Sequence, residues 1–189
     1  MRNNYGIVEY THHFIRQHVE EGDICIDATA GNGYDTVFLC ELVGDKGKVI
    51  AIDIQEMAVN NTKELLKEYA VEKHAEVILD SHEHIGEYAR EESISCIVFN
   101  LGYLPGGNHA LATQAKSTIL AMETSLKLLK KNGLLSVTIY SGGDSGFEEK
   151  DAVLEWMKNL DAKRYLVIVS EYYNRPNHPP IPVQIIRLR

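Results

Sequence analysis

The feature that most constrains the fold is the regular alternation of short apolar runs with longer stretches of helical pattern. Five such runs lie at 23–28, 48–54, 76–80, 94–100 and 134–140. Nearly continuous apolar runs are typical of strands that are covered on both faces. Strands that alternate with helices predict a parallel, doubly wound sheet. We therefore expect an α/β, Rossmann-like fold.

The end of the chain departs from this alternation. Two further strand-like runs, 165–173 and 182–189, are separated only by the residues NRPNHPPI. Strands joined by so short a segment form a hairpin, so one of the two runs antiparallel to the rest. The prediction is a seven-stranded, mostly parallel sheet with one reversed strand in a C-terminal hairpin. At 189 residues, the chain is expected to form a single domain over 1–189.

Two helices have ends that the sequence indicates. The spacing of Phe14, Ile15 and Val19 predicts a first helix that ends at Gly22. Residues 112–133 are expected to form a long helix that is closed by lysines and a glycine, the usual chemistry of a helix C-terminus.

Composition excludes several classes of protein. The longest apolar runs fall well short of the roughly 18 residues of a membrane span, and the N-terminus lacks the apolar core of an export signal. Cys25, Cys40 and Cys96 each lie in an apolar run, which predicts buried, reduced thiols in a cytoplasmic protein. Without a CxxC pair, no metal site is expected.

Charge is distributed unevenly along the chain. The net charge is −8, but residues 1–100 hold 8 basic and 19 acidic side chains, whereas residues 101–189 hold 11 and 8. A polyanion would therefore approach the C-terminal half. An acidic half that is simply solvated surface explains the same distribution, and both interpretations stay open here.

The turn DATAGNGYDT, residues 27–36, follows the first expected strand. Ligands of doubly wound sheets bind at the carboxyl ends of the strands. Gly31 and Gly33 permit positive φ and let a ligand approach the backbone. The third glycine of the dinucleotide pattern GxGxxG is missing, and Asp27 would repel a pyrophosphate. A carboxylate at this place suits a ligand that carries an ammonium and a sulfonium.

The ends of the next strands extend the same site. Asp53 ends the second strand, where an acid accepts both hydroxyls of a ribose. Asp80, Ser81 and His82 end the third strand and can face an adenine edge, and the fourth strand ends in FNLGYLPGG. These strand ends fit S-adenosylmethionine better than NAD.

The runs DATAGNGYDT, FNLGYLPGG and YYNRPNHPP resemble those of a family of class I S-adenosylmethionine-dependent methyltransferases. It is the small single-domain family labelled rRNA methylases and understood as the bacterial tRNA 5-(aminomethyl)-2-thiouridine methyltransferases. The resemblance implies methylation of the amine of 5-aminomethyl-(2-thio)uridine at the wobble position, in the anticodon loop, by a cytoplasmic enzyme that forms a homodimer. It also implies cofactor contacts from Asp27, Ala28, Thr29, Gly31, Asn32, Gly33, Asp35, Thr36, Asp53, Gln55, Ser81, His82, Asn100 and Leu101.

The tetrad NLGY, residues 100–103, is in register with the N-P-P-Y tetrad of amino-group methyltransferases. By that resemblance, Asn100 and the Leu101 carbonyl would accept hydrogen bonds from the target amine, and Tyr103 would stack on the base. His109 is the candidate base for removing a proton from the amine. The alternatives are that Asn100 caps the strand, Tyr103 packs in the core and His109 is a surface histidine.

The segment 172–180 is rich in proline, aromatic and polar residues. Aromatic faces and a cation are the groups that grip unpaired nucleotides, so we expect Tyr173, Asn174, Arg175 and His178 to bind the substrate. Turn chemistry alone also explains the prolines.

Three other functions compete with the tRNA assignment. The first is an N-methyltransferase that acts on ribosomal RNA or on a small-molecule amine, which the overall acidity favours. The second is an NAD-dependent oxidoreductase, against which the missing third glycine argues. The third is a binding module without catalysis, which the intact turn and tetrad disfavour.

Overall fold

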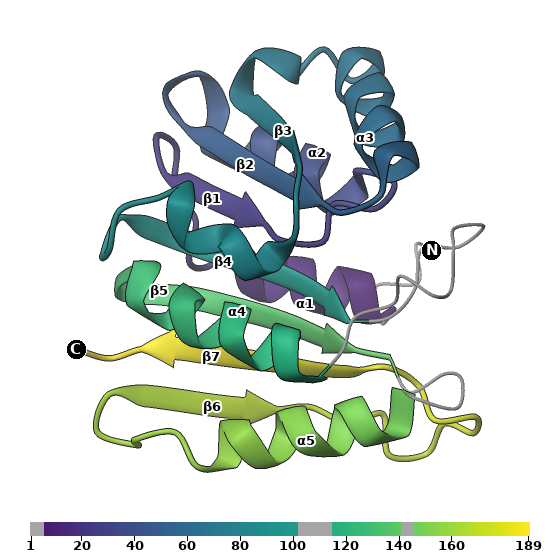
Figure 1. Ribbon diagram of the computed structural model, residues 1–189, viewed down its shortest axis with the longest axis vertical. Helices are drawn as coiled ribbons and strands as arrows, with labels where there is room; N and C mark the ends of the chain where they lie inside the picture. The colour runs from purple at the N-terminus through teal and green to yellow at the C-terminus, as the bar shows by residue number, and fades with distance from the viewer. Residues whose placement is uncertain (1–5, 102–114, 141–145) are drawn as a thin grey trace.

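The computed structural model describes residues 6–101, 115–140 and 146–189. Its seven strands form one sheet in the order β3-β2-β1-β4-β5-β7-β6. Only β7 among them is reversed, because it pairs antiparallel with both β5 and β6 (Figure 1). The mostly parallel sheet with a reversed strand in the C-terminal hairpin is therefore confirmed. The strands are β1 (Ile24–Asp27), β2 (Lys48–Asp53), β3 (Ala75–Leu79), β4 (Ile94–Leu101), β5 (Leu129–Ile139), β6 (Tyr165–Val169) and β7 (Ile181–Arg187).

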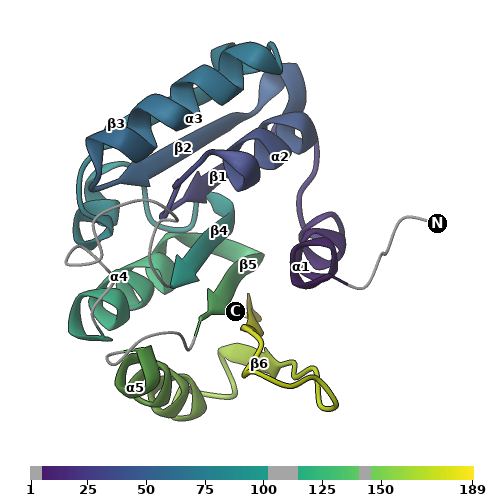
Figure 2. The ribbon, with the colours of Figure 1, turned by 90° about the vertical axis from the view of Figure 1, so that its right-hand side faces the viewer.

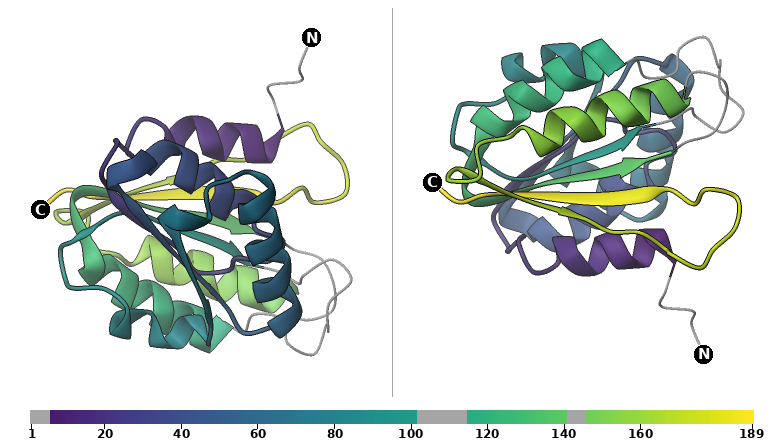
Figure 3. Two further views of the ribbon diagram at one scale, coloured as in Figure 1. Left: turned by 90° about the horizontal axis from the view of Figure 1, so that it is seen from above. Right: turned by 90° about the horizontal axis from the view of Figure 1, so that it is seen from below.

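Helices cover both faces of the sheet, as the continuous apolar strands require. The α-helices are α1 (Ile7–Ile15), α2 (Tyr34–Val43), α3 (Glu56–Glu68), α4 (Ala115–Leu128) and α5 (Gly146–Lys158), and the short 3₁₀ helices are η1 (Gly44–Lys46), η2 (Glu72–His74) and η3 (His82–Glu87). Helices α1, α2 and α3 lie on one face, and α4 and α5 lie on the other (Figures 2 and 3). Within the described ranges, no helix is long and apolar enough to cross a membrane.

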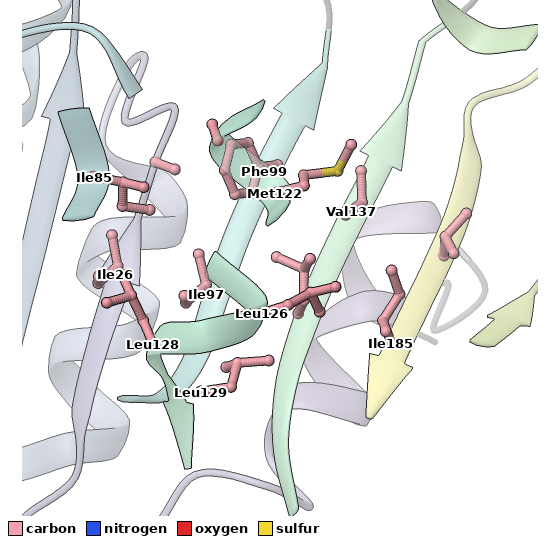
Figure 4. Packing of buried hydrophobic residues seen from close by; sticks show 14 of the residues in the cluster. Ile26, Ile85, Ile97, Phe99, Met122, Leu126, Leu128, Leu129, Val137 and Ile185 are labelled. Carbon is pink, nitrogen blue, oxygen red and sulfur yellow. The ribbon is translucent and has the colours of Figure 1, made fainter. Parts of the chain in front are cut away.

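The core has one layer on each side of the sheet. Phe99 and Ile97 of β4 pack with Met122 and Leu126 of α4 on one side (Figure 4). On the other side Leu39 of α2 packs among residues of β1, β2 and β4. The three cysteines are buried in this second layer and unbridged, as predicted. Because every described strand except β7 runs in the same direction, the carboxyl ends of the other six meet at one edge of the sheet.

The expected helix over 112–133 is wrong at its C-terminal end. Helix α4 ends at Leu128, and β5 begins at the next residue. The register between β4 and β5 shifts just after Ile94, and Asn132 has φ 64°. A Cβ on Gly133 would lie 2.8 Å from the Lys130 carbonyl oxygen. The lysine-glycine segment is thus a bulge near the start of a strand, because the residues that flank it, Leu129 and Leu134, pair with Ile94 and Cys96 of β4.

The first helix is also shorter than predicted. Helix α1 ends at Ile15, and the chain continues in a turn in which the His18 amide donates to the Ile15 carbonyl. That turn buries Val19 beside α2. Gly22, with φ 93°, then donates to the Val43 carbonyl. Residues 16–22 therefore pack against α2 and do not continue the predicted helix.

Candidate cofactor and substrate site

The β1–α2 turn is braced by α3. Gly31 and Gly33 adopt φ 55° and 86°, as the glycine pattern predicted. A Cβ on Gly33 would lie 2.9 Å from the Thr62 Cα atom, so only glycine fits there without a shift. The Thr62 hydroxyl donates to the Gly31 carbonyl at 3.2 Å, and the side-chain Nδ2 of Asn61 donates to Asn32 Oδ1 at 3.0 Å. The turn is thus held in one shape before any ligand arrives.

Asp27 lies beneath this turn with no exposed surface. The Thr36 hydroxyl donates to its Oδ2 at 2.6 Å, and the Thr29 amide donates to Oδ1 at 3.3 Å. Burial, followed by repulsion from the Asp35 carboxylate, raises the pKa of Asp27 to about 7. A direct contact between Asp27 and a bound cofactor stays a prediction.

Asp53 joins the end of β2 to the turn. Its Oδ2 accepts the Gly31 amide at 2.9 Å, and its Oδ1 accepts the Gln55 amide at 2.9 Å. A carboxylate has about four acceptor positions, so both oxygens keep room for one more donor each. The acid expected at the ribose is therefore both a brace for the turn and an available acceptor.

The end of β3 lies beside Asp53, because the Asp80 amide donates to the Asp53 carbonyl at 3.0 Å. The Ser81 hydroxyl accepts the Glu83 amide and caps η3. Burial lowers the pKa of His82, which keeps the ring neutral. Its Nε2 atom is buried without a hydrogen-bond partner among the described residues. An orphaned buried nitrogen at this strand end fits the polar edge of a bound purine.

The end of β4 meets the turn from the opposite side. The Asn100 amide N–H donates to the Thr29 hydroxyl at 2.7 Å, and Asn100 Nδ2 donates to Asp35 Oδ2 at 2.6 Å. Asp35 Oδ1 is 2.5 Å from Nε2 of His12, a residue that the sequence analysis did not single out. The Leu101 carbonyl already accepts the Tyr140 amide at 2.9 Å, which leaves it one free acceptor position. Tyr103 and His109 lie outside the described residues.

The segment between β6 and β7 lies at the same carboxyl edge of the sheet (Figure 2). Tyr173 is 96% exposed, and Asn174, Arg175 and His178 are exposed as well. In the sheet order, β4 and β5 separate this segment from the β1–α2 turn. The Tyr10 hydroxyl and the Ser170 hydroxyl share a hydrogen bond of 2.8 Å, which ties the base of the segment to α1.

Taken together, these groups suit S-adenosylmethionine better than a dinucleotide. Asp27 lies beside the turn where a pyrophosphate would sit, and the third glycine of the dinucleotide pattern is missing. An acid at the position of Asp53 can bind the ribose of either ligand. Among the described residues, no three His, Cys, Asp or Glu side chains converge as a metal site would require.

The sheet order with one reversed strand is that of the S-adenosylmethionine-dependent methyltransferase fold. The profile of the family described as "Putative rRNA methylase" matches residues 49–186, and the chain belongs to this family.

Three relatives agree with this membership. A tRNA (mnm(5)s(2)U34)-methyltransferase from the chloroplast of Arabidopsis thaliana is 34% identical over an alignment of 180 residues, and the match covers 90% of this chain and 66% of that protein. An rRNA-methylase structure from Clostridium thermocellum is 40% identical, with a TM-score of 0.93 over 96% of this chain and 97% of that one. A methyltransferase from Streptococcus mutans, solved in complex with SAH, is 40% identical, with a TM-score of 0.87 over 96% and 97% of the two chains.

Proposed function

We propose that the protein is an S-adenosylmethionine-dependent N-methyltransferase that acts on tRNA and methylates the amine of 5-aminomethyl-(2-thio)uridine at the wobble position. The observation that supports this substrate is the 34% identity to the chloroplast tRNA methyltransferase. Because this chain spans only 66% of that relative's length, the substrate is assigned as a proposal. The Asp53 carboxylate at the turn and the buried His82 nitrogen support the cofactor.

We assign the cofactor to the ends of β1, β2, β3 and β4. Asp53 would accept the ribose hydroxyls, and Ser81 and His82 would face the adenine. The remaining contacts would come from Asp27, Ala28, Thr29, Gly31, Asn32, Gly33, Asp35, Thr36, Gln55, Asn100 and Leu101. When bound, the cofactor supplies a methyl group that is already activated on a sulfonium. The protein's task is then to align the amine and exclude water.

Asn100 is the residue that would orient the amine. Its Nδ2 is directed at Asp35, so its Oδ1 is left to accept an amine N–H. The second carbonyl position of Leu101 is the other acceptor. The amine must lose its extra proton before its lone pair attacks, and the methyl group then passes from sulfur to nitrogen. Stacking by Tyr103 and proton removal by His109 stay predictions.

The segment 172–180 would bind the anticodon loop. Its exposed ring, amide, guanidinium and imidazole are suited to unpaired bases and phosphates. A wobble base is already single-stranded, so little unpairing energy is needed. The net charge of residues 101–189 is positive, which favours approach of RNA to this half.

A homodimer and a cytoplasmic location complete the proposal. Strand β6 is one of the two edge strands of the described sheet, and an apolar groove lies between it and α5, lined by Leu154, Met157 and Leu166 among others. Joining two such edges would cover the groove. Light scattering that gives a monomeric mass at working concentration would refute the dimer. The three buried, unbridged thiols support a reducing compartment.

The deciding experiment is transfer of a labelled methyl group from S-adenosylmethionine to tRNA from cells that lack the gene, followed by nucleoside mass spectrometry. We expect one methyl group to be gained on 5-aminomethyl-uridine derivatives at the wobble position. The Asn100→Ala variant should lose transfer by at least about 100-fold while it still binds the cofactor. Near wild-type activity in this variant would refute the role of the tetrad.

The same assay separates the alternatives. Turnover on bulk ribosomal RNA or on free amines, without turnover on tRNA, would favour the other N-methyltransferase functions. An absorbance titration with NADH tests the oxidoreductase, and we expect no binding. Tight cofactor binding without transfer to any of these substrates would favour a binding module.

A further inference from the structure

A chain of three side chains links α1, α2 and the end of β4. His12 Nε2 lies 2.5 Å from Asp35 Oδ1, and Asn100 Nδ2 lies 2.6 Å from Asp35 Oδ2. The His12 and Asp35 side chains are 14% and 21% exposed, so water screens the link only partly. Both oxygens of Asp35 are thus engaged with residues from other elements.

This link fixes the orientation of the Asn100 amide. A carboxylate only accepts hydrogen bonds, so the group of Asn100 that faces Asp35 is the NH₂ group. Rotating the amide by half a turn would bring Asn100 Oδ1 against the carboxylate and leave two acceptors in contact. The carboxylate therefore holds Oδ1 on the side away from Asp35, as an acceptor for another donor.

His12 fixes Asp35 in turn. Its ring is stacked on Phe38 of α2, with centroids 3.6 Å apart and planes 1° apart. Arg16 lies 4.7 Å from the centre of the Phe38 ring. This packing aims Nε2–H at Asp35 Oδ1, which restrains rotation of the carboxylate. A carboxylate so restrained presents Oδ2 to Asn100 in one geometry.

We propose that Asp35 and His12 are positioning residues that lock the Asn100 amide with its oxygen toward the target amine. The inference rests on the proposed function, in which Asn100 accepts the amine N–H. The link also places the Asp35 carboxylate in direct contact with the Asn100 amide, on the side away from the amine. As the methyl group bonds to nitrogen, that nitrogen becomes cationic, and a nearby carboxylate favours the developing charge.

The cleanest test compares two substitutions of His12. His12→Gln keeps an N–H donor near the position of Nε2 but loses the ring. His12→Phe keeps the ring stacked on Phe38 but loses the donor. We expect His12→Phe to lower kcat about 10-fold, and His12→Gln to recover most of that loss. A ring that serves packing alone would give the opposite order, which would overturn the proposal.

Three further measurements keep the result interpretable. The neighbouring His13→Phe variant is the matched control, because His13 is exposed and bonds only Gln17 among the contacts described for it. Asp35→Ala should lower kcat about 100-fold. Cofactor affinity, measured by calorimetry, should change by less than about 3-fold in both His12 variants. A parallel loss of cofactor affinity and kcat would also overturn the positioning role.

A spectroscopic readout makes the inference independent of the substrate. In the isolated protein, the two side-chain amide proton resonances of Asn100 should shift in Asp35→Ala and, to a smaller extent, in His12→Phe. Unchanged resonances would overturn the link whatever the substrate is. Absence of wild-type transfer to tRNA, together with the expected shifts, would overturn the proposed substrate and leave the link standing.

Discussion

Two regions at the carboxyl edge of the sheet are built in opposite ways. The β1–α2 turn is held by bonds from Asp53, Asn61 and Thr62, and Asn100 docks on its Thr29 hydroxyl. The segment 172–180 projects into solvent, and Tyr173 is almost fully exposed at 96%. One backbone bond, from the Arg175 amide to the Tyr172 carbonyl, closes its first turn.

The difference corresponds to the two ligands proposed for these regions. A small cofactor with a fixed set of polar groups is bound best by a site that is already formed, because no ordering entropy is lost on binding. A tRNA loop presents bases and phosphates that themselves rearrange, and exposed aromatic and basic side chains can follow them. Substitutions in the two regions should therefore affect different constants.

The largest effect is expected at Asp53. Asp53→Ala removes both ribose acceptors, and the loss of hydrogen bonds to a charged group corresponds to about 3 kcal/mol, or about 100-fold in cofactor affinity. From its place at a strand end alone, Asp53→Ala is expected to weaken cofactor binding far more than it weakens folding. Because the carboxylate also accepts the Gly31 and Gln55 amides, we now expect a loss of about 1–2 kcal/mol in the free energy of unfolding as well.

Asp53→Asn is the matched variant for this prediction. Its single carbonyl oxygen can retain one backbone bond, so its stability should lie between those of the wild type and Asp53→Ala. Calorimetric titration with S-adenosylmethionine and urea denaturation measure the two quantities separately. An affinity loss no larger than the stability loss, compared in kcal/mol, would show that Asp53 only braces the turn.

The second effect is a pH dependence of the free energy of unfolding, which arises from Asp27 on the buried side of the turn. The ordinary pKa of Asp27 is 3.8, and burial and Asp35 raise it to about 7 in the folded protein. Between about pH 4 and pH 7 the folded state therefore binds more protons than the unfolded state at this residue. The free energy of unfolding should fall as the pH rises through that window.

Asp27→Asn isolates this contribution, because its amide does not titrate. Relative to this variant, the wild type should lose on the order of 2 kcal/mol between pH 4.5 and 7.5. The comparison is needed because His82, whose pKa is lowered, contributes in the opposite direction. If the free energies of unfolding of the two proteins change equally with pH across this window, a buried, protonated Asp27 is refuted.

Much of the fold was predictable from local pattern. Apolar runs identify the strands because both faces of each central strand are covered, and the short link before β7 left a hairpin as its only connection. The ends of α1 and α4 were mispredicted because tertiary pairing overrides local signals. A Cβ on Gly133 would lie 3.0 Å from the Ile94 carbonyl oxygen, so this glycine lets β5 approach β4 closely and does not cap a helix.

The site was predictable where it depends on strand ends and missed where it depends on packing between helices. Asp53 and Gly31 meet because parallel strands end at one edge, which the sequence order implies. His12 contacts Asp35 across the interface between α1 and α2, where its ring stacks on Phe38. Neither the spacing of His12 nor its neighbours in the sequence indicate that contact.

The smallest effect is expected in the exposed segment. Tyr173→Ala removes a ring that is solvated in the free protein and stacks on a base in the proposed complex. Stacking of one base on an aromatic side chain corresponds to about 1–3 kcal/mol, so KM for tRNA should rise about 10-fold. Cofactor affinity, kcat and stability should stay near wild type, because the ring has almost no contacts to lose.

Tyr69→Ala is the control for that substitution, since Tyr69 is also a tyrosine with a large exposed fraction, 51%, but follows α3 away from the segment. A rise in KM confined to Tyr173→Ala, and a further rise in the double variant with Arg175→Ala at low salt, would identify the segment as an RNA-binding surface. Equal KM values for Tyr173→Ala and Tyr69→Ala would remove the segment from the substrate site. The segment 172–180 would then not be the adaptable RNA-binding counterpart of the preformed cofactor turn. Recognition of tRNA would have to come from residues nearer to Asn100.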